Sequence, residues 1–551
     1  MSNKITNKKI LVLRNFTVEP ILNELEDKFL NKDIKCKFDI STYDSAITEV
    51  LKIKKTKINQ YDCVIILLSF ETYLQQSKKF DQALKGFKKL ILDLIHILSQ
   101  RKFKNINLFF FFSNELIKPG AKKNNLISKC LKEISKIKIK NVNIFDLVEE
   151  ISLFDNKKKF FDKIYWKNTL FPFNGEGQKL SSIILYLKLK SIFNLDFKLI
   201  ILDADNTLWN GIIDENGFKK INFKNIKKNI DYLKFHKSLK RLISLGYLLA
   251  LSTKNDLNLI KKAFQFHKKK KILTIKDFAV VKANWDPKYL NISSIFKYLN
   301  LSIDNAIFID DSSFEISSVN KLLPRLETFN FFKYNNFHLN INKILINKNI
   351  NITEEDKKRT KLYIQEDVRK NEKKRFENYQ EYIKSLKITL TVKKNSKKNI
   401  QRLSQLTLRT NQFNSTTTRL DKNDIKKILK NEKKLIYECA AIDRFGDYGI
   451  IALAIVTLSK KITLMTNLLM SCRALGREIE NYFVNYIVMD LKKNYKIIDL
   501  EIIYKKNKKN NLVKNFFNKN FKKMSKTGNY YTSRQLKLVD NKYKLMQINE
   551  K

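Results

Sequence analysis

Cysteine is scarce in this chain, and the cysteines present do not cluster. Five occur in 551 residues, and no two of them have C-x-x-C spacing. Their scatter argues against a disulfide framework or a zinc site and favours a reducing compartment. Met1 to Ile5 lack the apolar stretch of a secretory signal. No apolar run approaches the ~20 residues of a membrane span, so we expect a cytoplasmic protein with no membrane partner.

Acidic residues are also scarce: 55 Asp and Glu stand against 108 Lys and Arg, which gives a formal net charge of +53. An excess of this size is typical of nucleic-acid-binding proteins. However, lysine, asparagine and isoleucine are abundant along the entire chain, and no basic stripe with interleaved aromatic residues stands out. Local basic patches, rather than overall charge, mark nucleic-acid binders. We therefore attribute the charge to the composition of an AT-rich genome and expect no nucleic-acid partner. The electrostatic field of this positive charge would nevertheless attract an acidic protein.

The most informative segment is an apolar run, Leu199 to Leu202, that is followed by the sequence D-A-D-N-T-L-W. Residues at i and i+2 of a strand point the same way, so Asp203 and Asp205 would leave the strand end on one side. Two carboxylates this close repel each other unless a cation lies between them. Mg²⁺ is a hard ion that prefers carboxylate oxygens and keeps water that a phosphate can displace. A helix cap, the alternative interpretation, would need only one Asp.

Three later segments carry polar groups in a consistent order. In open α/β sheets, ligands bind outside the carboxyl ends of the strands, so groups at these ends would converge. Any one of the segments could instead be a helix cap or a turn, but the ordered set predicts one site for phosphate and metal. The polar groups are Ser252 and Thr253 after an apolar run, Lys288 after a proline, and Asp310 and Asp311 after a second apolar run.

The four segments together resemble the motifs of the haloacid dehalogenase (HAD) superfamily: D-x-D-x-T, a Ser/Thr at a strand end, a Lys, and paired acids. The extended form D-x-D-N-T-L-W, followed by K-N and W-x-P-K, is similar to subfamily IIIC, the FkbH-like proteins. Those proteins are similar to enzymes that load a glyceryl unit onto an acyl carrier protein. The resemblance implies a Rossmann-like parallel sheet over residues 196–348, with Mg²⁺ as cofactor. It also implies a phosphorylated small-molecule acyl donor and an acyl carrier protein as partners.

The resemblance further implies a role for each motif residue. Asp203 would be the nucleophile, and Asp205 the general acid and base. A carboxylate that attacks phosphorus forms an aspartyl phosphate, which splits one difficult hydrolysis into two easier steps. Thr253 and Lys288 would hold the phosphoryl oxygens, where a cation offsets their charge. The Mg²⁺ ligands implied are Asp203, Asp205, Asp310 and Asp311.

The spacing of the motifs leaves no room for a full cap domain, because about forty residues separate Trp209 from the second motif and about twenty separate Lys288 from Asp310. An uncapped site excludes water poorly, so the substrate or a neighbouring domain must cover it. This favours a large substrate, such as a phosphorylated group carried on a protein arm. Closure of the N-terminal domain over a small molecule is the alternative.

Residues 1–192 alternate short apolar strands with amphipathic helices, a second α/β pattern. The stretch R-N-F-T-V-E-P after the first strand resembles the N-terminal domain of the same family, which is related to SGNH-type hydrolases. The Gly-Asp-Ser block and the late Asp-x-x-His of those hydrolases are missing, and the first strand leads to Asn15 and Thr17 instead. His96 lies in an apolar helical run and is expected in the core. We predict a non-catalytic scaffold that docks a partner or shapes access to the HAD site.

Residues 353–386 are strongly charged and contain neither Gly nor Pro. They predict one long helical linker, capped by Thr353 and Asp356 and solvated between domains. Residues 387–551 form the last domain, in which three stretches, T-N-Q-F-N, D-R-F-G-D and S-C-R-A-L-G-R, are similar to the family's GNAT-like acyltransferase domain. The predicted fold class is thus α/β in three domains: SGNH/flavodoxin-like, HAD-like with a minimal cap, and GNAT-like α+β.

GNAT proteins bind the pyrophosphate of CoA on an R/Q-x-x-G-x-G/A loop at a helix N-terminus. Arg473 and Gly476 match this loop, but Glu478 stands where the last small residue belongs, and a carboxylate opposes pyrophosphate. The sequence therefore leaves CoA binding open and favours a pocket for the phosphopantetheine arm of a carrier protein. Cys472 is the motif-matched thiol of this site, although a buried structural cysteine is the commoner outcome.

Many relatives have cysteine where this chain has Ser252, so a thioester step is in doubt, whereas a phosphatase step needs only the hydroxyl of Thr253. The first hypothesis is an Mg²⁺-dependent enzyme that dephosphorylates a phosphoglyceryl-type acyl group through Asp203 and delivers the acyl group to a carrier protein. The alternatives are a plain phosphatase acting on a small molecule or on nucleic-acid ends, and a non-catalytic assembly protein.

Overall fold

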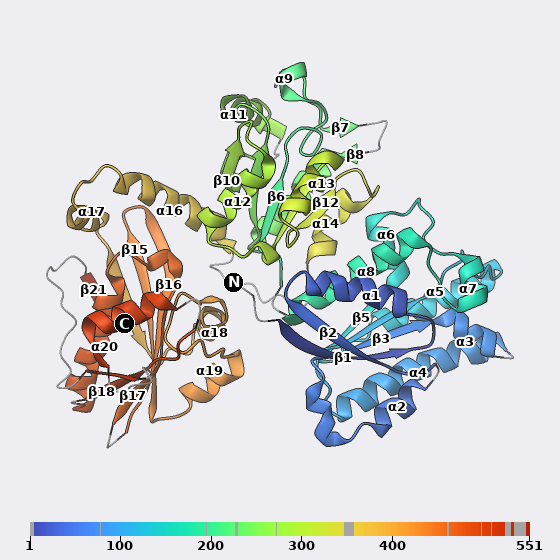
Figure 1. Cartoon of the computed structure of the whole chain (residues 1–551), viewed down its shortest axis with the longest axis horizontal. Helices are drawn as coiled ribbons and strands as arrows, with labels where there is room; N and C mark the ends of the chain where they lie inside the picture. The colour runs from blue at the N-terminus through green and yellow to red at the C-terminus, as the bar shows by residue number, and fades with distance from the viewer. Residues whose placement is uncertain are drawn as a thin grey trace. The chain divides into compact units, whose positions relative to one another are not determined.

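The structure is a computed structural model in which the chain forms two compact units, residues 1–351 and 352–551 (Figure 1). No described helix is long and apolar enough to cross a membrane. Side chains of residues 270, 530–533 and 547–550 are outside the description. The residues described are 5–43, 45–77, 79–193, 195–225, 230–270, 273–346, 357–459, 462–497, 499–507, 510–523, 530–533 and 547–550.

The first unit begins with a five-stranded parallel sheet in the order β2-β1-β3-β4-β5. This is the flavodoxin-like order, in which the chain reverses direction across the sheet between β1 and β3. Every residue of β3 and β4 is buried, as expected for central strands covered by helices on both faces. The strands are β1 Thr6–Arg14, β2 Ile34–Ile40, β3 Cys63–Ser69, β4 Ile106–Phe111 and β5 Val142–Asp146.

In the described residues, eight α-helices connect these strands or follow them. Helix α4 is amphipathic, and it buries one face that includes Phe87, Ile91 and Leu94. His96 lies on the opposite, exposed face of this helix, so the expectation of a core histidine was wrong. The helices are α1 Glu19–Leu30, α2 Ala46–Lys52, α3 Phe70–Gln76, α4 Phe80–Gln100, α5 Ala121–Ser135, α6 Leu147–Phe154, α7 Lys163–Thr169 and α8 Gly175–Leu189.

A second five-stranded parallel sheet follows in the order β10-β9-β6-β11-β12. The fully buried β6 lies between β9 and β11, so the carboxyl ends of these three strands are neighbours. The strands are β6 Leu199–Leu202, β9 Leu248–Thr253, β10 Phe278–Ala283, β11 Ala306–Asp310 and β12 Glu327–Asn330. The helices are α10 Tyr232–Ser244, α11 Leu257–Phe266, α12 Lys288–Leu299, α13 Ser313–Leu322 and α14 Phe337–Leu345.

The two sheets of the first unit share one hydrophobic core, which extends from Ile10 to Leu345. Phe154 of α6 packs against Tyr334 and Phe337, with ring centroids 5.5 and 5.9 Å apart. Buried Lys32, from the turn after α1, forms an ion pair with Glu327 at 3.1 Å. The predicted domains 1–192 and 196–348 thus pack against each other as one unit.

The segment between the first two motifs contains only short elements in its described part before α10 begins. Its described part contains helix α9, Ile213–Asn216, and the two-stranded sheet of β7, Lys224–Asn225, with β8, Ile230–Asp231, before α10 begins. Between Lys288 and the end of β11 lie only α12 and one 3₁₀ turn. Neither described segment contains a cap domain, which agrees with the minimal cap expected from the motif spacing.

The second unit contains a mixed sheet in the order β19-β20-β18-β17-β16-β15-β13-β21. Strands β13, β15, β16 and β17 pair antiparallel, whereas β17 and β18 pair parallel after the crossover helix α20. This α+β arrangement confirms the predicted class. The strands are β13 Thr389–Lys394, β14 Phe413–Asn414, β15 Lys434–Asp443, β16 Gly446–Thr457, β17 Thr463–Met470, β18 Leu500–Ile503, β19 Lys522–Lys523, β20 Tyr530–Ser533 and β21 Gln547–Glu550. The helices are α18 Ile400–Arg409, α19 Lys422–Leu429, α20 Ile479–Tyr495 and α21 Asn511–Asn520.

The predicted linker 353–386 is not one solvated helix. It forms α16, Arg359–Lys373, and α17, Tyr379–Leu386, and the side chain of Asn378 caps α17 by accepting a hydrogen bond from the Gln380 backbone N–H. Asn378 favours such caps because its amide oxygen satisfies a free N–H of the first helical turn. Both helices belong to the second unit, and each buries side chains. The cap predicted at residues 353 and 356 lies outside the described residues.

Candidate active site at the carboxyl edge of the second sheet

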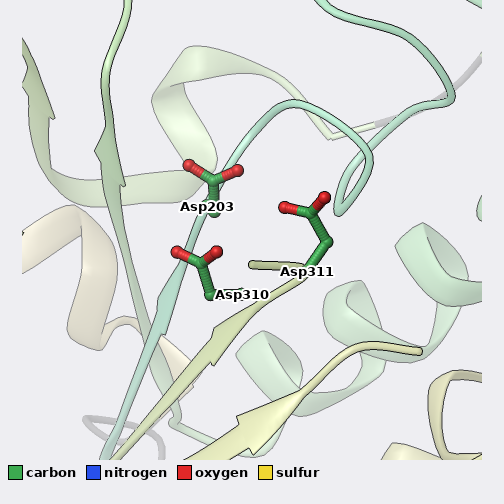
Figure 2. Close-up of side chains that lie close together, drawn as sticks. All are labelled: Asp203, Asp310 and Asp311. Atoms are coloured by element: carbon green, nitrogen blue, oxygen red, sulfur yellow. The ribbon is translucent and has the colours of Figure 1, made fainter. Parts of the chain in front are cut away.

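Three carboxylates meet where β6 and β11 end (Figure 2). Asp203 follows β6, Asp310 is the last residue of β11, and Asp311 comes next; one oxygen from each lies within 4.8 Å of the others. The parallel pairing of the two strands brings these residues together, and the Asp203 backbone N–H donates to the carbonyl of Ile309 at 3.0 Å. Asp203 and Asp310 are buried. The structure therefore assembles three of the four acids that the sequence predicted as metal ligands.

Lys288, the first residue of α12, reaches into this acid group. Its Nζ lies 2.8 Å from Asp203 Oδ1 and 2.5 Å from Asp310 Oδ2. Burial by itself would lower the pKa of Lys288, but the two carboxylates outweigh it and raise the pKa above its ordinary value. Lys288 is therefore a fixed cation beside the predicted nucleophile.

The acid group has more negative charge than Lys288 offsets. Desolvation, and then repulsion from Asp203, raise the pKa of Asp310 to about 7 and that of Asp311 to about 6. Three ionised carboxylates and one ammonium leave two formal negative charges, which one divalent cation would neutralise. An all-oxygen donor set suits a hard cation such as Mg²⁺. The residues present thus fit the metal that the motifs imply.

Asp205 is not part of this acid group, because its side chain is held elsewhere. Its Oδ1 accepts hydrogen bonds from Trp209 Nε1 at 2.9 Å and from the Ile213 backbone N–H at 3.3 Å, and its Oδ2 accepts from Asn255 Nδ2 at 3.0 Å. Desolvation raises the pKa of Asp205 although these donors oppose the rise. Asp205 follows the predicted nucleophile, Asp203, by two residues. This is the position that the motif gives to the general acid and base.

The loop that carries Asp205 has a fixed shape. Asn206 has a left-handed backbone, φ +54°, and its side-chain oxygen accepts a hydrogen bond from the Gly211 N–H. Asparagine is one of the few non-glycine residues that adopt this region readily. Buried His236 contacts the Leu208 carbonyl through Nε2 at 2.8 Å. Burial lowers the pKa of His236 to about 4, so the imidazole is neutral near pH 7 and acts as a structural group.

The polar residues at the end of β9 are buried beside this loop. Thr253 Oγ1 accepts a hydrogen bond from Asn255 Nδ2 at 2.9 Å, so one amide joins the predicted phosphate-binding hydroxyl to Asp205. Ser252 is fully buried and its Oγ makes no hydrogen bond in the described structure. The sequence motifs contained Trp209 and Asn255, but the contacts of these two residues with Asp205 could not be read from spacing alone.

Two exposed aromatic side chains lie close in sequence to Lys288 and to Asp311. Trp285 precedes α12 by three residues and is 66% exposed, and Phe314 in the first turn of α13 is 76% exposed. They are the most exposed aromatic residues whose side chains the structure describes. Exposed aromatic side chains are suited to contact with a partner or a large substrate.

At the carboxyl edge of the first sheet, buried polar residues form hydrogen bonds with one another. Asn15, after β1, exchanges two hydrogen bonds with the backbone of Ser69 at the end of β3, at 2.8 and 2.7 Å. Ser69 Oγ donates to Glu71 at 2.6 Å, and the Ser113 backbone N–H donates to the other oxygen of the same carboxylate at 2.5 Å. All four residues are buried. The carboxyl ends of β1, β3 and β4 are therefore joined by a buried hydrogen-bond network.

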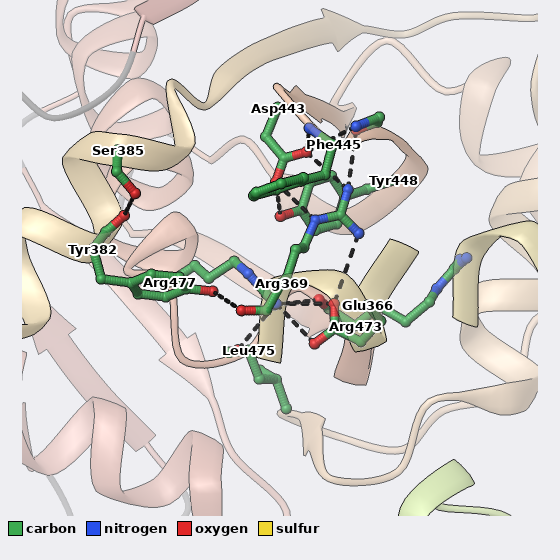
Figure 3. Close-up of polar contacts among 11 residues, drawn as sticks. Glu366, Arg369, Tyr382, Ser385, Asp443, Phe445, Tyr448, Arg473, Leu475 and Arg477 are labelled. Atoms are coloured by element: carbon green, nitrogen blue, oxygen red, sulfur yellow. Dashed lines mark hydrogen bonds and ion pairs between the residues drawn. The ribbon is translucent and has the colours of Figure 1, made fainter. Parts of the chain in front are cut away.

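In the second unit, the loop between β17 and α20 carries the predicted carrier-arm residues. Cys472 is exposed, whereas the other four cysteines are buried, so the expectation of a buried structural thiol was wrong. Gly476 has φ +71°. Arg473 is half-buried in the same loop (Figure 3). The structure therefore places these three residues together and leaves the thiol accessible.

Two buried arginines join α16 to neighbouring segments: Arg477 joins it to this loop, and Arg369 joins it to the hairpin of β15 and β16 (Figure 3). Arg477 forms a bidentate ion pair with Glu366 at 2.8 and 2.9 Å and donates to the Arg473 carbonyl at 2.5 Å. Arg369 forms a bidentate pair with Asp443 at 2.7 and 2.8 Å and stacks on Tyr448, with 3.9 Å between its guanidinium carbon and the ring centroid. The sequence analysis missed this network, because its partners are up to 111 residues apart.

The residues at the start of α20 do not fit the pyrophosphate of CoA. Glu478 is the N-cap residue and has a left-handed backbone, φ +58°, which a non-glycine side chain rarely adopts. Glu480 follows in the first turn, and its Oε2 is buried and has no hydrogen-bond partner among the described residues. A helix N-terminus attracts one anionic group, and here the chain's own carboxylates lie at that position.

No protein-family model and no curated protein sequence matches the chain. Among solved structures, the N-terminal part of BF1531 from Bacteroides fragilis, which contains a phosphatase domain complexed with Mg, is 19% identical; the match covers 63% of this chain and 96% of that chain, with a TM-score of 0.50. That share is about the share of the first compact unit, and the likeness shows a common fold.

Shorter matches were found to two further enzymes. The ribosomal-protein-S18-alanine N-acetyltransferase from Escherichia coli is 8% identical over 26% of this chain and 90% of its own, with a TM-score of 0.21. The 3-deoxy-D-manno-octulosonate 8-phosphate phosphatase from Moraxella catarrhalis is 18% identical over 25% of this chain and 67% of its own, with a TM-score of 0.17.

Proposed function

We propose that the protein is an Mg²⁺-dependent phosphatase of the HAD type that forms an aspartyl phosphate on Asp203. The observation that carries this proposal is the acid group of Asp203, Asp310 and Asp311 with the Lys288 ammonium inside it. Such an arrangement has little structural purpose, because burying several charges costs more than packing apolar side chains of the same volume. The BF1531 fragment of similar fold contains a phosphatase domain and was crystallised with Mg, which supports the same assignment.

Each residue then has a defined task. Asp203 attacks phosphorus, and Lys288 offsets charge on the phosphoryl oxygens as the leaving oxygen departs. Bound Mg²⁺, held by the three acids, would supply further positive charge at the phosphoryl group. Thr253 would hold a phosphoryl oxygen. Asp205 gives a proton to the leaving oxygen and later takes one from the water that hydrolyses the aspartyl phosphate.

The substrate that we propose is a phosphoglyceryl-type acyl group, which the enzyme dephosphorylates and passes to an acyl carrier protein. The resemblance to FkbH-like proteins suggests this pair, and an uncapped site suits a large partner. Trp285 and Phe314, exposed and close in sequence to Lys288 and Asp311, would contact that partner. Exposed Cys472, with Arg473 and Gly476, would receive the phosphopantetheine arm. We propose that the domain of the first sheet, residues 1–192, is not catalytic and instead docks the partner or shapes access to the site.

A plain phosphatase is the second candidate, and a specific observation favours it. Ser252 replaces the cysteine of many relatives, and it is fully buried beside Thr253. A hydroxyl without a neighbouring base is a poor acceptor of an acyl group. Transfer would then need Cys472 or direct attack by the carrier thiol.

The first test is hydrolysis of p-nitrophenyl phosphate with and without Mg²⁺. We expect Mg²⁺-dependent phosphate release that Asp203→Asn abolishes, while Asp286→Asn, an exposed acid in the loop before Lys288, retains it. Activity without Mg²⁺, or in Asp203→Asn, would contradict the proposal. The second test incubates the protein with 1,3-bisphosphoglycerate and carrier proteins and weighs the carrier by mass spectrometry. Phosphate release with an unmodified carrier would leave the plain phosphatase.

A further inference from the structure

The carboxylate of Asp205 is held by three donors from two segments of the chain, the loop after β6 and the residues after β9. Trp209 Nε1 and the Ile213 backbone N–H both donate to Oδ1, at 2.9 and 3.3 Å, and Asn255 Nδ2 donates to Oδ2 at 3.0 Å. A carboxylate oxygen has two lone pairs. Oδ1 is thus saturated, whereas Oδ2 keeps one lone pair for a proton.

Trp209 is placed to hold this orientation without moving. The side chain is 1% exposed, and Phe264 packs edge-on against its ring with 5.6 Å between centroids. The preceding carbonyl, that of Leu208, is fixed by His236. A buried, packed indole presents its N–H in one direction, so its hydrogen bond to Oδ1 sets the rotation of the carboxylate plane.

We propose that Trp209 is a positioning residue that makes Oδ2 of Asp205 the atom that exchanges the proton during phosphoryl transfer. This inference rests on the proposed phosphatase function. In the first step, the bond between Asp203 and phosphorus forms, the bond from phosphorus to the leaving oxygen breaks, and the proton on Oδ2 passes to that oxygen. In the second step, water attacks phosphorus, its proton passes to Oδ2, and the bond to Asp203 breaks.

The two steps depend on Asp205 to different degrees with different substrates. An alkoxide is a poor leaving group and needs the proton as the bond breaks, whereas p-nitrophenolate leaves without one. The ratio kcat/KM reports the steps up to formation of the aspartyl phosphate, and kcat also includes its hydrolysis. Loss of orientation at Asp205 should therefore have an effect that depends on the leaving group, which a general structural defect would not have.

The test compares Trp209→Phe with the wild-type enzyme on glycerol 3-phosphate and on p-nitrophenyl phosphate, each with Mg²⁺. We expect kcat/KM for the alkyl ester to fall roughly 10- to 100-fold and kcat/KM for the aryl ester to fall less than about 3-fold. For the aryl ester kcat should fall more than kcat/KM, so KM falls as well. Trp166→Phe is the matched control: this tryptophan is equally buried, its Nε1 has no hydrogen-bond partner in the part of the chain that the structure describes, and we expect no selective change.

A second variant covers the case in which phenylalanine leaves a cavity that unfolds the loop. Replacing Trp209 by benzothienylalanine keeps the shape of the indole and removes the N–H, and it should give the same selective loss. Equal loss on both esters, or no loss, in this isosteric variant would overturn the role of Trp209. Absence of Mg²⁺-dependent hydrolysis by the wild-type protein would instead overturn the proposed function, and this role with it.

Discussion

At the scale of single residues, Lys288 shows how the acid group is kept together in the folded chain. Its ammonium contacts two buried carboxylates that would otherwise repel each other. Removing one partner of a buried ion pair leaves uncompensated charge, which costs about 3–5 kcal/mol. This residue therefore joins stability to chemistry, because the same positive charge would face the phosphoryl group.

We predict that Lys288→Met lowers kcat at least ~100-fold and lowers the free energy of unfolding by about 3 kcal/mol at pH 8. Added Mg²⁺ should restore part of the stability, because it offsets the same carboxylates, but not the activity. Lys254→Met is the control: Lys254 is partly exposed, pairs with Glu315 at 2.7 Å, and should cost less than about 1 kcal/mol. Urea unfolding and steady-state kinetics measure both effects. A stable, active Lys288→Met variant would show that the ammonium has neither role.

At the scale of elements, buried groups join strand ends that lie far apart in sequence. Glu71 connects the end of β3 to the residue that follows β4 by two positions, Ser113. Desolvation raises the pKa of Glu71 from its ordinary value to about 7 despite these hydrogen bonds. Because the pKa is higher in the folded than in the unfolded chain, protonation stabilises the fold, and this stabilisation is lost as the pH rises through 7.

We therefore predict that the wild-type protein loses up to about 3 kcal/mol of unfolding free energy between pH 5 and pH 8 relative to Glu71→Gln. Glutamine keeps an acceptor for the Ser113 N–H and cannot ionise. Urea unfolding of both proteins at the two pH values gives the comparison. Parallel pH profiles would mean that Glu71 does not titrate in this range.

The network of α16 with the hairpin of β15 and β16 gives a second prediction at this scale. Arg369→Met would leave Asp443 buried without its bidentate partner, and we expect a loss of about 3 kcal/mol. Arg444→Met, which removes a more exposed arginine paired with Glu372 at 2.6 Å, should cost less than about 1 kcal/mol. Hydrogen exchange in the full chain should show faster exchange in the β15–β16 turn, residues 443–448, only for Arg369→Met. Equal losses of stability and equal changes in hydrogen exchange in the two variants would contradict the role of the Arg369–Asp443 pair.

The loop between β10 and α12 gives a third prediction. If a carrier protein docks at the uncapped site, Trp285→Ala should raise KM for a carrier-bound phosphorylated substrate by roughly 10-fold, the loss typical of a truncated interface anchor. The same variant should leave hydrolysis of p-nitrophenyl phosphate unchanged, because this small ester does not need the exposed indole. Ile164→Ala, at an apolar residue in α7 that is also strongly exposed, is the control and should change neither value. An unchanged KM in Trp285→Ala would show that Trp285 does not contact the carrier protein.

At the scale of the whole molecule, the sequence predicted the sheets better than the contacts between distant parts. Apolar runs that end on acids or hydroxyls marked the carboxyl ends of β6, β9 and β11, because buried parallel strands have a strong local pattern. The same pattern placed Asp203 beside Asp310. The pattern could not show that the first two predicted domains share one core, since that depends on aromatic contacts such as Phe154 with Phe337.

The failures have a common physical cause. Asn378 caps α17 and marks the break between α16 and α17. The sequence analysis missed this break, because the uniformly charged composition of 353–386 predicted one helix. Trp209 and Asn255 reach Asp205 only after the loop folds, and Arg369 finds Asp443 across 74 residues. The exposure of Cys472 likewise depends on the packing of its loop. Spacing predicts on which face of a strand a side chain lies. It does not predict which side chain, distant in sequence, becomes its hydrogen-bond or ion-pair partner.

The most direct measurement is the identification of the residue that becomes phosphorylated. The protein, incubated with Mg²⁺ and a phosphate ester and quenched in acid, should yield one phosphorylated peptide, modified at Asp203, and beryllofluoride should block the reaction when Mg²⁺ is present. Asp203→Asn should give no adduct under the same conditions. A phosphoryl group on another residue, or turnover without any covalent adduct, would contradict the account.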